Sequence, residues 1–139
     1  MENTPKILEI DPPNIEEIRK VLPDSELPTC YAYGDTIYNP KKVKVGPDLL
    51  IHELKHLEAQ GYTVEGAKEW WKFYLEDKKF RLDEELKGYG AQLKYIKHNY
   101  NNKIYKTILF KIADALSSSM YGKLVTFQQA ETLARRASQ

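Results

Sequence analysis

Apolar residues recur at helical spacing along most of the chain, and short aromatic and β-branched runs interrupt this pattern in the N-terminal third. Residues three and four positions apart share one face of a helix, so the recurrence predicts amphipathic helices that bury one face. The expected helices span about residues 14–22, 49–60, 63–79, 82–98, 105–116 and 126–136.

Two stretches are more typical of strands than of helices. Residues 7–10 are mostly apolar, and residues 30–38 are rich in aromatic and β-branched side chains around the dipeptide Gly34-Asp35, which favours a hairpin turn. Val43 and Val45 are expected to extend the strand pairing. The pattern therefore predicts a helix-rich α+β fold with one short β-sheet ahead of the helix at 49–60.

The chain length of 139 residues suits one domain, expected to span residues 1–139 with a loose tail at 1–6. The helices of the C-terminal part, residues 103–139, are expected to pack in the ordinary way or to cover the cleft of the domain. The aromatic cluster of Trp70, Trp71, Phe73 and Tyr74 is expected to lie in the core.

The segment 52–56, with the sequence His-Glu-Leu-Lys-His, carries the chemistry. Residues four apart lie on the same face of a helix, so the imidazoles of His52 and His56 can reach one metal ion. Zinc accepts imidazole nitrogen and carboxylate oxygen as ligands. Glu53 lies beside that ion and can take a proton from a zinc-bound water, an arrangement that suits hydrolysis.

A catalytic zinc site needs a third protein ligand, and the expected one is a carboxylate on a later helix. Glu85 is favoured, because Gly88 one turn further on allows a close approach of two helices, and Tyr89 and Gln92 continue the same face. Glu84 is the alternative third ligand.

Other groups are expected to surround the metal. Gln60 lies four residues after His56, where it could orient that ligand. The oxyanion that forms when a carbonyl is attacked needs a hydrogen-bond donor, and the sequence offers Tyr89, Tyr62, Tyr33 and His98 without choosing among them; Tyr89 is named with Glu53 as a candidate catalytic residue. The strand at 31–38 could bind an extended peptide through its backbone.

Residues 50–92 resemble the gluzincins, zinc peptidases that pair a helix bearing the His-Glu-x-x-His motif with a downstream glutamate helix. The resemblance is to their smallest, phage- or prophage-type members, or minigluzincins. It implies a zincin-like fold, a Zn²⁺ cofactor and a metallopeptidase activity on a peptide or protein substrate. It also implies that His52, His56 and Glu85 are the metal ligands and Glu53 the general base.

The strand around residues 34–38 is similar to the edge strand that precedes the motif helix in such proteins. Two features depart from the family pattern. Lys55 is charged where the motif usually has an uncharged residue, and Gly88 and Tyr89 stand where better-known members often place a small residue followed by an acid.

The composition and the cysteine count argue against some classes of partner and of metal site. With 21 basic and 20 acidic residues the formal net charge is +1, which argues against a nucleic-acid partner, and the lysines at 41, 42 and 44 are expected to be solvated. The single cysteine, Cys30, cannot form an intramolecular disulfide or a thiolate-rich zinc site. The sequence has no apolar run long enough for a membrane span and no signal-peptide core, so a soluble, cytoplasmic protein without a membrane partner is expected.

Two other functions remain open. A catalytically silent metal-binding protein of structural or interaction type would keep the same ligands. A carboxylate-bridged di-iron protein would use the spacing of Glu53 and His56, but it requires a second Glu-x-x-His that the sequence lacks.

Overall fold

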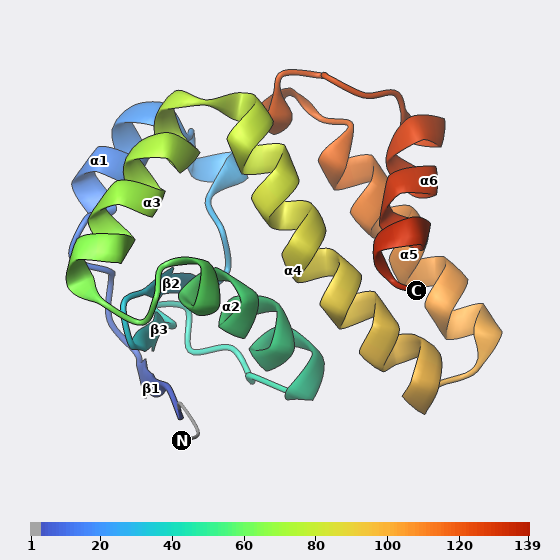
Figure 1. Cartoon of the computed structure of the whole chain (residues 1–139), viewed down its shortest axis with the longest axis horizontal. Coiled ribbons are helices and arrows are strands. Elements are labelled where there is room, and N and C mark those ends of the chain that lie inside the picture. The colour runs from blue at the N-terminus through green and yellow to red at the C-terminus, as the bar shows by residue number, and fades with distance from the viewer. Residues whose placement is uncertain (1–3) are drawn as a thin grey trace.

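The computed structural model describes residues 4–139, which form six α-helices, two 3₁₀ turns and one small sheet (Figure 1). This confirms the helix-rich α+β class predicted from the sequence. The helices are α1 (Ile15–Val21), α2 (Pro47–Ala59), α3 (Val64–Glu76), α4 (Lys78–Asn99), α5 (Asn102–Leu116) and α6 (Phe127–Ala137), and the 3₁₀ turns are η1 (Asp24–Glu26) and η2 (Ser119–Tyr121).

The sheet contains strands β1 (Lys6–Leu8), β2 (Tyr31–Tyr33) and β3 (Thr36–Tyr38) in the order β1-β3-β2. Strand β3 pairs in parallel with β1 and antiparallel with β2. The expectation that the strand around residues 34–38 is an edge strand is therefore wrong, because β3 is the central strand and β2 lies at the edge. Gly34 turns the hairpin between β2 and β3 with a φ of +68°, a conformation that glycine adopts without a steric penalty. The predicted hairpin is therefore confirmed.

The expected extension of the sheet through Val43 and Val45 is wrong, because neither residue belongs to a strand. The side chain of Asn39 explains the difference. Its amide nitrogen donates to the carbonyl of Val43 at 2.8 Å and its oxygen accepts from the Val43 N–H at 3.1 Å. These two bonds use the groups that Val43 would need for strand pairing, and both valines pack beside the cluster under α2 instead.

The boundary between the third and fourth helices also differs from the prediction, which had the third helix running to residue 79 and the next starting at 82. The helix α3 ends at Glu76 and α4 begins at Lys78. The carboxylate of Asp77 accepts hydrogen bonds from the N–H groups of Lys79 and Phe80, which caps α4. A single capping residue therefore separates the two helices.

The start of α5 differs as well: it lies at Asn102 instead of residue 105, because the side chain of Asn101 accepts a hydrogen bond from the N–H of Ile104 and caps the helix there.

Two other helix ends follow the predicted signals. Gly61 has a φ of +68° directly after α2, and Thr126 and Gln129 form a capping box at the start of α6. Asn14 occupies the N-cap position of α1, but its side chain makes no capping hydrogen bond.

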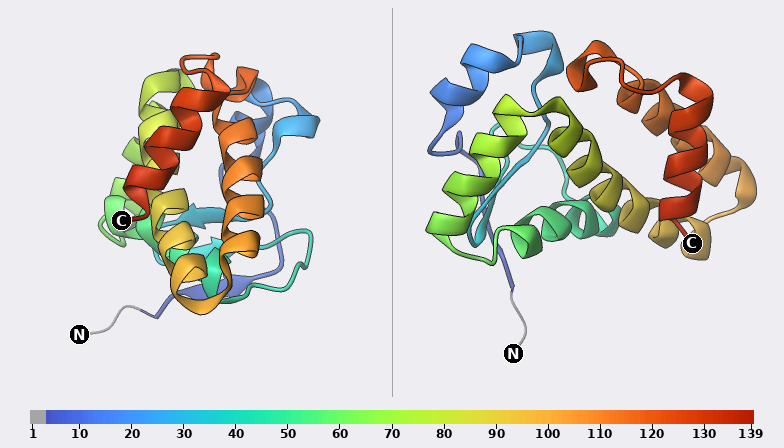
Figure 2. Two further views of the ribbon diagram at one scale, coloured as in Figure 1. Left: turned by 90° about the vertical axis from the view of Figure 1, so that its right-hand side faces the viewer. Right: turned by 45° about the horizontal axis from the view of Figure 1, so that its top comes forward.

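Helix α4 crosses the molecule between the sheet with α1, α2 and α3 on one side and the pair α5 and α6 on the other (Figures 1 and 2). One apolar cluster lies between α4, α5 and α6, and two smaller clusters lie between the sheet and helices α1, α2 and α3. Over residues 4–139, no helix has both the length and the apolar character needed to span a membrane.

Candidate metal centre

The site lies where α2 and α4 meet, and a glycine makes their close contact possible. A Cβ atom added at Gly88 would lie 2.8 Å from Nε2 of His52, which is too close for any larger residue without a shift of the imidazole. Gly88 therefore lets α4 approach the face of α2 that carries the two histidines.

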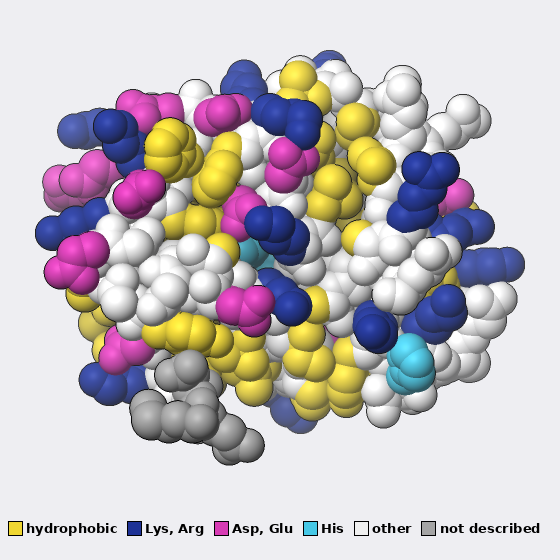
Figure 3. Space-filling model, viewed as in Figure 1, with side chains coloured by type: hydrophobic (Ala, Val, Ile, Leu, Met, Phe, Trp, Pro, Cys, Tyr) yellow, Lys and Arg dark blue, Asp and Glu magenta, His cyan; other side chains and the backbone are white. Residues whose placement is uncertain are grey.

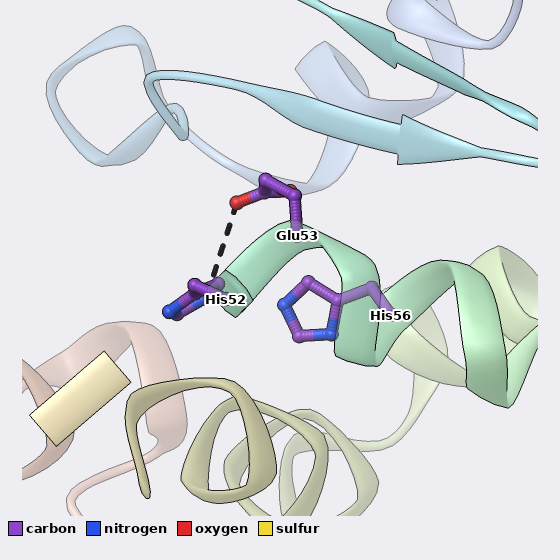
Figure 4. A group of neighbouring side chains, drawn as sticks. All are labelled: His52, Glu53 and His56. Atoms are coloured by element: carbon purple, nitrogen blue, oxygen red, sulfur yellow. Dashed lines mark ion pairs between the residues drawn. The ribbon is translucent and has the colours of Figure 1, made fainter. Parts of the chain in front are cut away.

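The three residues of the motif are buried at this contact, each with about 5% of its surface exposed. His52, Glu53 and His56 offer donor atoms that lie within 4.8 Å of one another. The two imidazoles point toward α4, whereas Glu53 leaves the helix toward the strands (Figure 4). One oxygen of Glu53 still lies 3.9 Å from Nε2 of His52.

Glu85 brings a second carboxylate to the imidazoles from α4. Its Oε1 lies 2.6 Å from Nε2 of His56 and 3.2 Å from Nε2 of His52. Glu84 points elsewhere, because one of its oxygens accepts a hydrogen bond from the Trp70 indole and the other pairs with Lys87. Of these two adjacent glutamates, the structure thus brings only Glu85 to the histidine pair.

Hydrogen bonds fix the orientation of His52. Its Nδ1 lies 3.0 Å from Oε1 of Gln92, and the Gln92 amide nitrogen in turn donates to Asp48 at 3.2 Å. An amide oxygen can only accept, so His52 carries a proton on Nδ1. Within the described residues, Nδ1 of His56 has no hydrogen-bond partner.

The charges of the site are strongly coupled. Burial alone lowers the pKa of His52, but the hydrogen bond and charge of Glu85, together with the charge of Glu53, raise this pKa to about 9. Burial raises the pKa of Glu85, but His56 and His52 outweigh it and hold this pKa well below the ordinary value. Burial raises the pKa of Glu53 above its usual range. The two carboxylates therefore stabilise a positive charge on the His52 imidazole.

These residues fit a zinc ion. Two imidazole nitrogens and one carboxylate oxygen are the ligands that a catalytic zinc takes from a protein. The negative charge of Glu85 that favours a proton on His52 also attracts a metal cation, and a metal that binds there has to displace that proton. Two atoms that share a zinc ion lie about 3.3 Å apart. The contact of 2.6 Å between Glu85 and His56 therefore has to widen, while the contact of 3.2 Å to His52 already suits.

A cavity of about 400 Å³ opens beside the histidines. Its walls come from α2, α3, α4, the loop around η1 and the segment around η2, and they include Tyr89, whose ring packs edge-on against His52 at a centroid distance of 4.5 Å. Cys30 lines the wall as well, and burial followed by the charge of Glu53 raises its pKa to about 11, so it remains a thiol at neutral pH.

The surface around the centre carries mixed charges, and a histidine is visible near the middle of the face in Figure 3.

Several expected neighbours of the metal lie elsewhere. The side chain of Gln60 does not orient His56, because its amide bonds instead to the N–H of Gly34 and the carbonyl of Ala32 in the β2–β3 hairpin. Of the alternative oxyanion donors, Tyr33 and Tyr62 pack in the apolar clusters, and His98 is exposed and bonded to the carbonyl of Lys94. None of these three lines the cavity.

Two groups of strand β2 that could bind an extended peptide are already occupied. The carbonyl of Ala32 accepts from Gln60 and from the Trp71 indole, both at 2.9 Å, and the N–H of Gly34 donates to Gln60 at 2.7 Å. The Gln60 amide thus takes the place that a substrate backbone would need at Ala32 and Gly34.

Two residues of the site were not predicted from the sequence. The hydroxyl groups of Tyr74 and Tyr121 donate to Oε2 of Glu85 at 3.0 and 3.4 Å. Tyr74 belongs to the aromatic cluster predicted to be core, and its helical spacing from Trp70 and Trp71 gives no sign of a second role. The core prediction is confirmed for Trp70, Trp71 and Tyr74, but it is wrong for Phe73, which is 44% exposed. Tyr121 lies in a short turn without any periodic pattern.

Searches among protein families, curated proteins and solved structures find no match to this chain. The chemistry of the site is therefore the basis for inferring a function.

Proposed function

We propose that this protein is a zinc-dependent metallopeptidase in which His52, His56 and Glu85 hold the ion. The observation that carries the proposal is the convergence of Glu85 Oε1 on the Nε2 atoms of both histidines, with the Glu53 carboxylate beside them. A bound zinc ion would polarise the carbonyl of the substrate and acidify an attacking water.

Glu53 serves as the general base in this proposal. Its carboxylate accepts the proton of the attacking water and then passes it to the leaving amine. Burial raises the pKa of Glu53, which makes the carboxylate a stronger base than an exposed one. Tyr89 on the cavity wall supplies a hydroxyl group for the developing oxyanion.

The residues that line the cavity favour a peptide substrate with apolar or basic side chains. Its walls include the aromatic rings of Trp70, Trp71 and Tyr89, and the acid that lies on them away from the metal centre is Glu26. Among the described residues, no lysine or arginine lines it. Away from the metal centre, an acidic side chain would therefore be repelled by Glu26, whereas a basic one would be attracted.

A second candidate function is metal binding without catalysis. It is favoured by the occupied groups of β2, and by the hydrogen bond of 2.9 Å from Ser119 to Glu26, which joins two walls of the cavity. Both features restrict the access of a peptide to the centre.

The experiment that tests the proposal combines zinc content with hydrolysis of a broad peptide library. In the Glu53→Gln variant we expect unchanged zinc content and a loss of turnover of about 10²- to 10⁴-fold, the typical contribution of a general base. Glu58→Gln is the matched control, because Glu58 lies on the same helix and its side chain is 63% exposed. The control should retain both zinc and turnover.

The outcomes separate the two candidates. A wild-type protein that binds zinc stoichiometrically but cleaves no peptide would support the silent metal-binding protein. Full turnover in Glu53→Gln would refute Glu53 as the base, and absence of zinc binding in the wild type would refute both candidates.

A further inference from the structure

Glu85 uses its two oxygens for different purposes. Oε1 faces the histidine nitrogens, at 2.6 and 3.2 Å, and Oε2 accepts hydrogen bonds from the hydroxyl groups of Tyr74 and Tyr121. Both tyrosines are almost fully buried, with 2% of their surface exposed. A buried phenol hydroxyl group needs a hydrogen-bond acceptor, and here one carboxylate oxygen accepts hydrogen bonds from two of them.

The two tyrosines come from distant parts of the chain. Tyr74 lies in α3, eleven positions before Glu85, and Tyr121 lies in η2, thirty-six positions after it. Tyr121 therefore belongs to the C-terminal part of the chain, which contributes the cavity wall around residues 115–121.

A buried arginine joins the segments that carry the tyrosines. Arg81, with 2% of its surface exposed, donates hydrogen bonds to the backbone carbonyls of Tyr74, Leu75 and Met120. One planar guanidinium thus links the end of α3 to η2 through several bonds in a fixed geometry. This link ties together the backbones of the two segments that carry the tyrosines.

We infer that Tyr74 and Tyr121 are positioning residues that hold Oε2 of Glu85, so that only Oε1 is offered to the metal. The C-terminal segment around η2 then completes the metal centre rather than merely covering it. This inference rests on the proposed role of Glu85 as a zinc ligand. Groups that hold a metal ligand in this way typically contribute 10- to 100-fold to metal affinity.

The geometry also ranks the two tyrosines. The Tyr74 bond of 3.0 Å is of ordinary length, whereas the Tyr121 bond of 3.4 Å is long for an O–H donor. Tyr74 is accordingly the stronger of the two positioning residues, and Tyr121 has the smaller effect.

The test compares the zinc dissociation constants of the wild type, Tyr74→Phe, Tyr121→Phe and the double variant, measured by competition with a chromogenic chelator. We expect a loss of affinity of about 10- to 100-fold for Tyr74→Phe, a smaller loss for Tyr121→Phe and the largest loss for the double variant. Tyr105→Phe is the matched control, because this buried phenol in α5 bonds to Ser138, away from the site. It should leave the zinc affinity unchanged.

The visible spectrum of the cobalt-substituted protein gives a readout that a purely structural role would not move. Without the phenols, both oxygens of Glu85 become free to bind the ion, so the cobalt bands should change because they report coordination geometry. Tyr105→Phe should show the wild-type spectrum. If the double variant fails to fold, the two single variants decide the question.

Failure of this inference can be told apart from failure of the proposed function. If the wild type binds no zinc, both are wrong. If the wild type binds zinc, but the phenylalanine variants bind it equally tightly with an unchanged cobalt spectrum, only the positioning role is wrong.

Discussion

Two glycines of α4, only two positions apart, face two different regions of the molecule. An added Cβ at Gly88 would meet the imidazole of His52 at 2.8 Å, whereas one at Gly90 would meet the backbone oxygen of Ala137 in α6 at 2.6 Å. The same helix thus packs closely against the candidate metal centre on one side and against α6 on the other.

The two sides differ in what they bury. The side toward α2 carries the polar residues Glu85 and Gln92, which bond to the histidines. The side toward α5 and α6 carries apolar residues such as Leu93 and Ile96. Buried polar groups need exact partners, whereas apolar groups need only a filled volume. The apolar side therefore stabilises the helix, and the polar side holds the residues of the candidate metal centre in place.

The largest effect on metal binding is expected on the polar side, from Glu85→Gln. The amide keeps the size of the side chain but removes the negative charge that faces His52 and His56. We expect zinc affinity to fall by more than about 100-fold, beyond the usual effect of an outer group. Isothermal titration with zinc measures this, and an affinity within tenfold of the wild type would contradict the role of Glu85.

The largest effect on stability is expected on the apolar side, from Leu93→Ala. Leu93 is fully buried in the cluster shared with α5 and α6, so the cavity left behind should lower the free energy of unfolding by about 2–5 kcal/mol. Urea unfolding measures the loss, and the exposed neighbour Lys94 provides the control Lys94→Ala. Zinc affinity of the folded variant should stay near that of the wild type. A parallel loss of affinity would show that the two sides are not independent.

Gln92→Leu should weaken zinc binding without removing a proposed metal ligand. The leucine cannot accept the hydrogen bond of 3.0 Å from Nδ1 of His52, so the imidazole loses its fixed orientation. We expect zinc affinity to fall by about 10- to 100-fold. His98→Ala, at the exposed histidine of the same helix, is the control and should bind zinc like the wild type.

The two glycines allow a direct comparison of the two sides. The extra methyl group should destabilise each variant by about 1–3 kcal/mol through overpacking, offset by up to about 1 kcal/mol because alanine favours the helix. Gly88→Ala should also reduce zinc affinity, since it displaces the His52 imidazole. Gly90→Ala should affect only the thermal unfolding midpoint, because its methyl group meets the end of α6. Equal zinc affinities in the two variants would contradict this division.

Sequence reasoning located the parts of the site that depend on local spacing. The motif at 52–56 lies on one helix, so the relation of His52 to His56 follows from helical geometry alone. The hairpin and the capping box at Thr126 are equally local, and both are confirmed. The helix-rich α+β class follows from the same periodic patterns.

The remaining differences arise where the outcome depends on contacts between distant segments. Gln60 was expected near the metal on helical spacing, and its backbone N–H does bond to the His56 carbonyl, but its side-chain amide bonds to the β2–β3 hairpin instead. Tyr121 contacts Glu85 only after the chain has passed through α5 and returned. A periodic sequence pattern predicts local helices and strands, but it does not predict such a long-range contact. Val43 is taken out of the sheet by one side chain, Asn39, whose bonds no strand pattern anticipates.

The smallest effect should come from Glu84→Gln, one position before the proposed ligand. The amide oxygen can still accept the hydrogen bond of 2.9 Å from the Trp70 indole, so this buried contact is retained. The lost ion pair involves Lys87, whose side chain is 61% exposed, and such pairs contribute less than about 1 kcal/mol. Zinc affinity should therefore remain within about twofold of the wild type, measured in the same titration as Glu85→Gln. A loss of affinity in Glu84→Gln as large as in Glu85→Gln would mean that charge near the histidines, rather than the oxygen aimed at them, holds the metal.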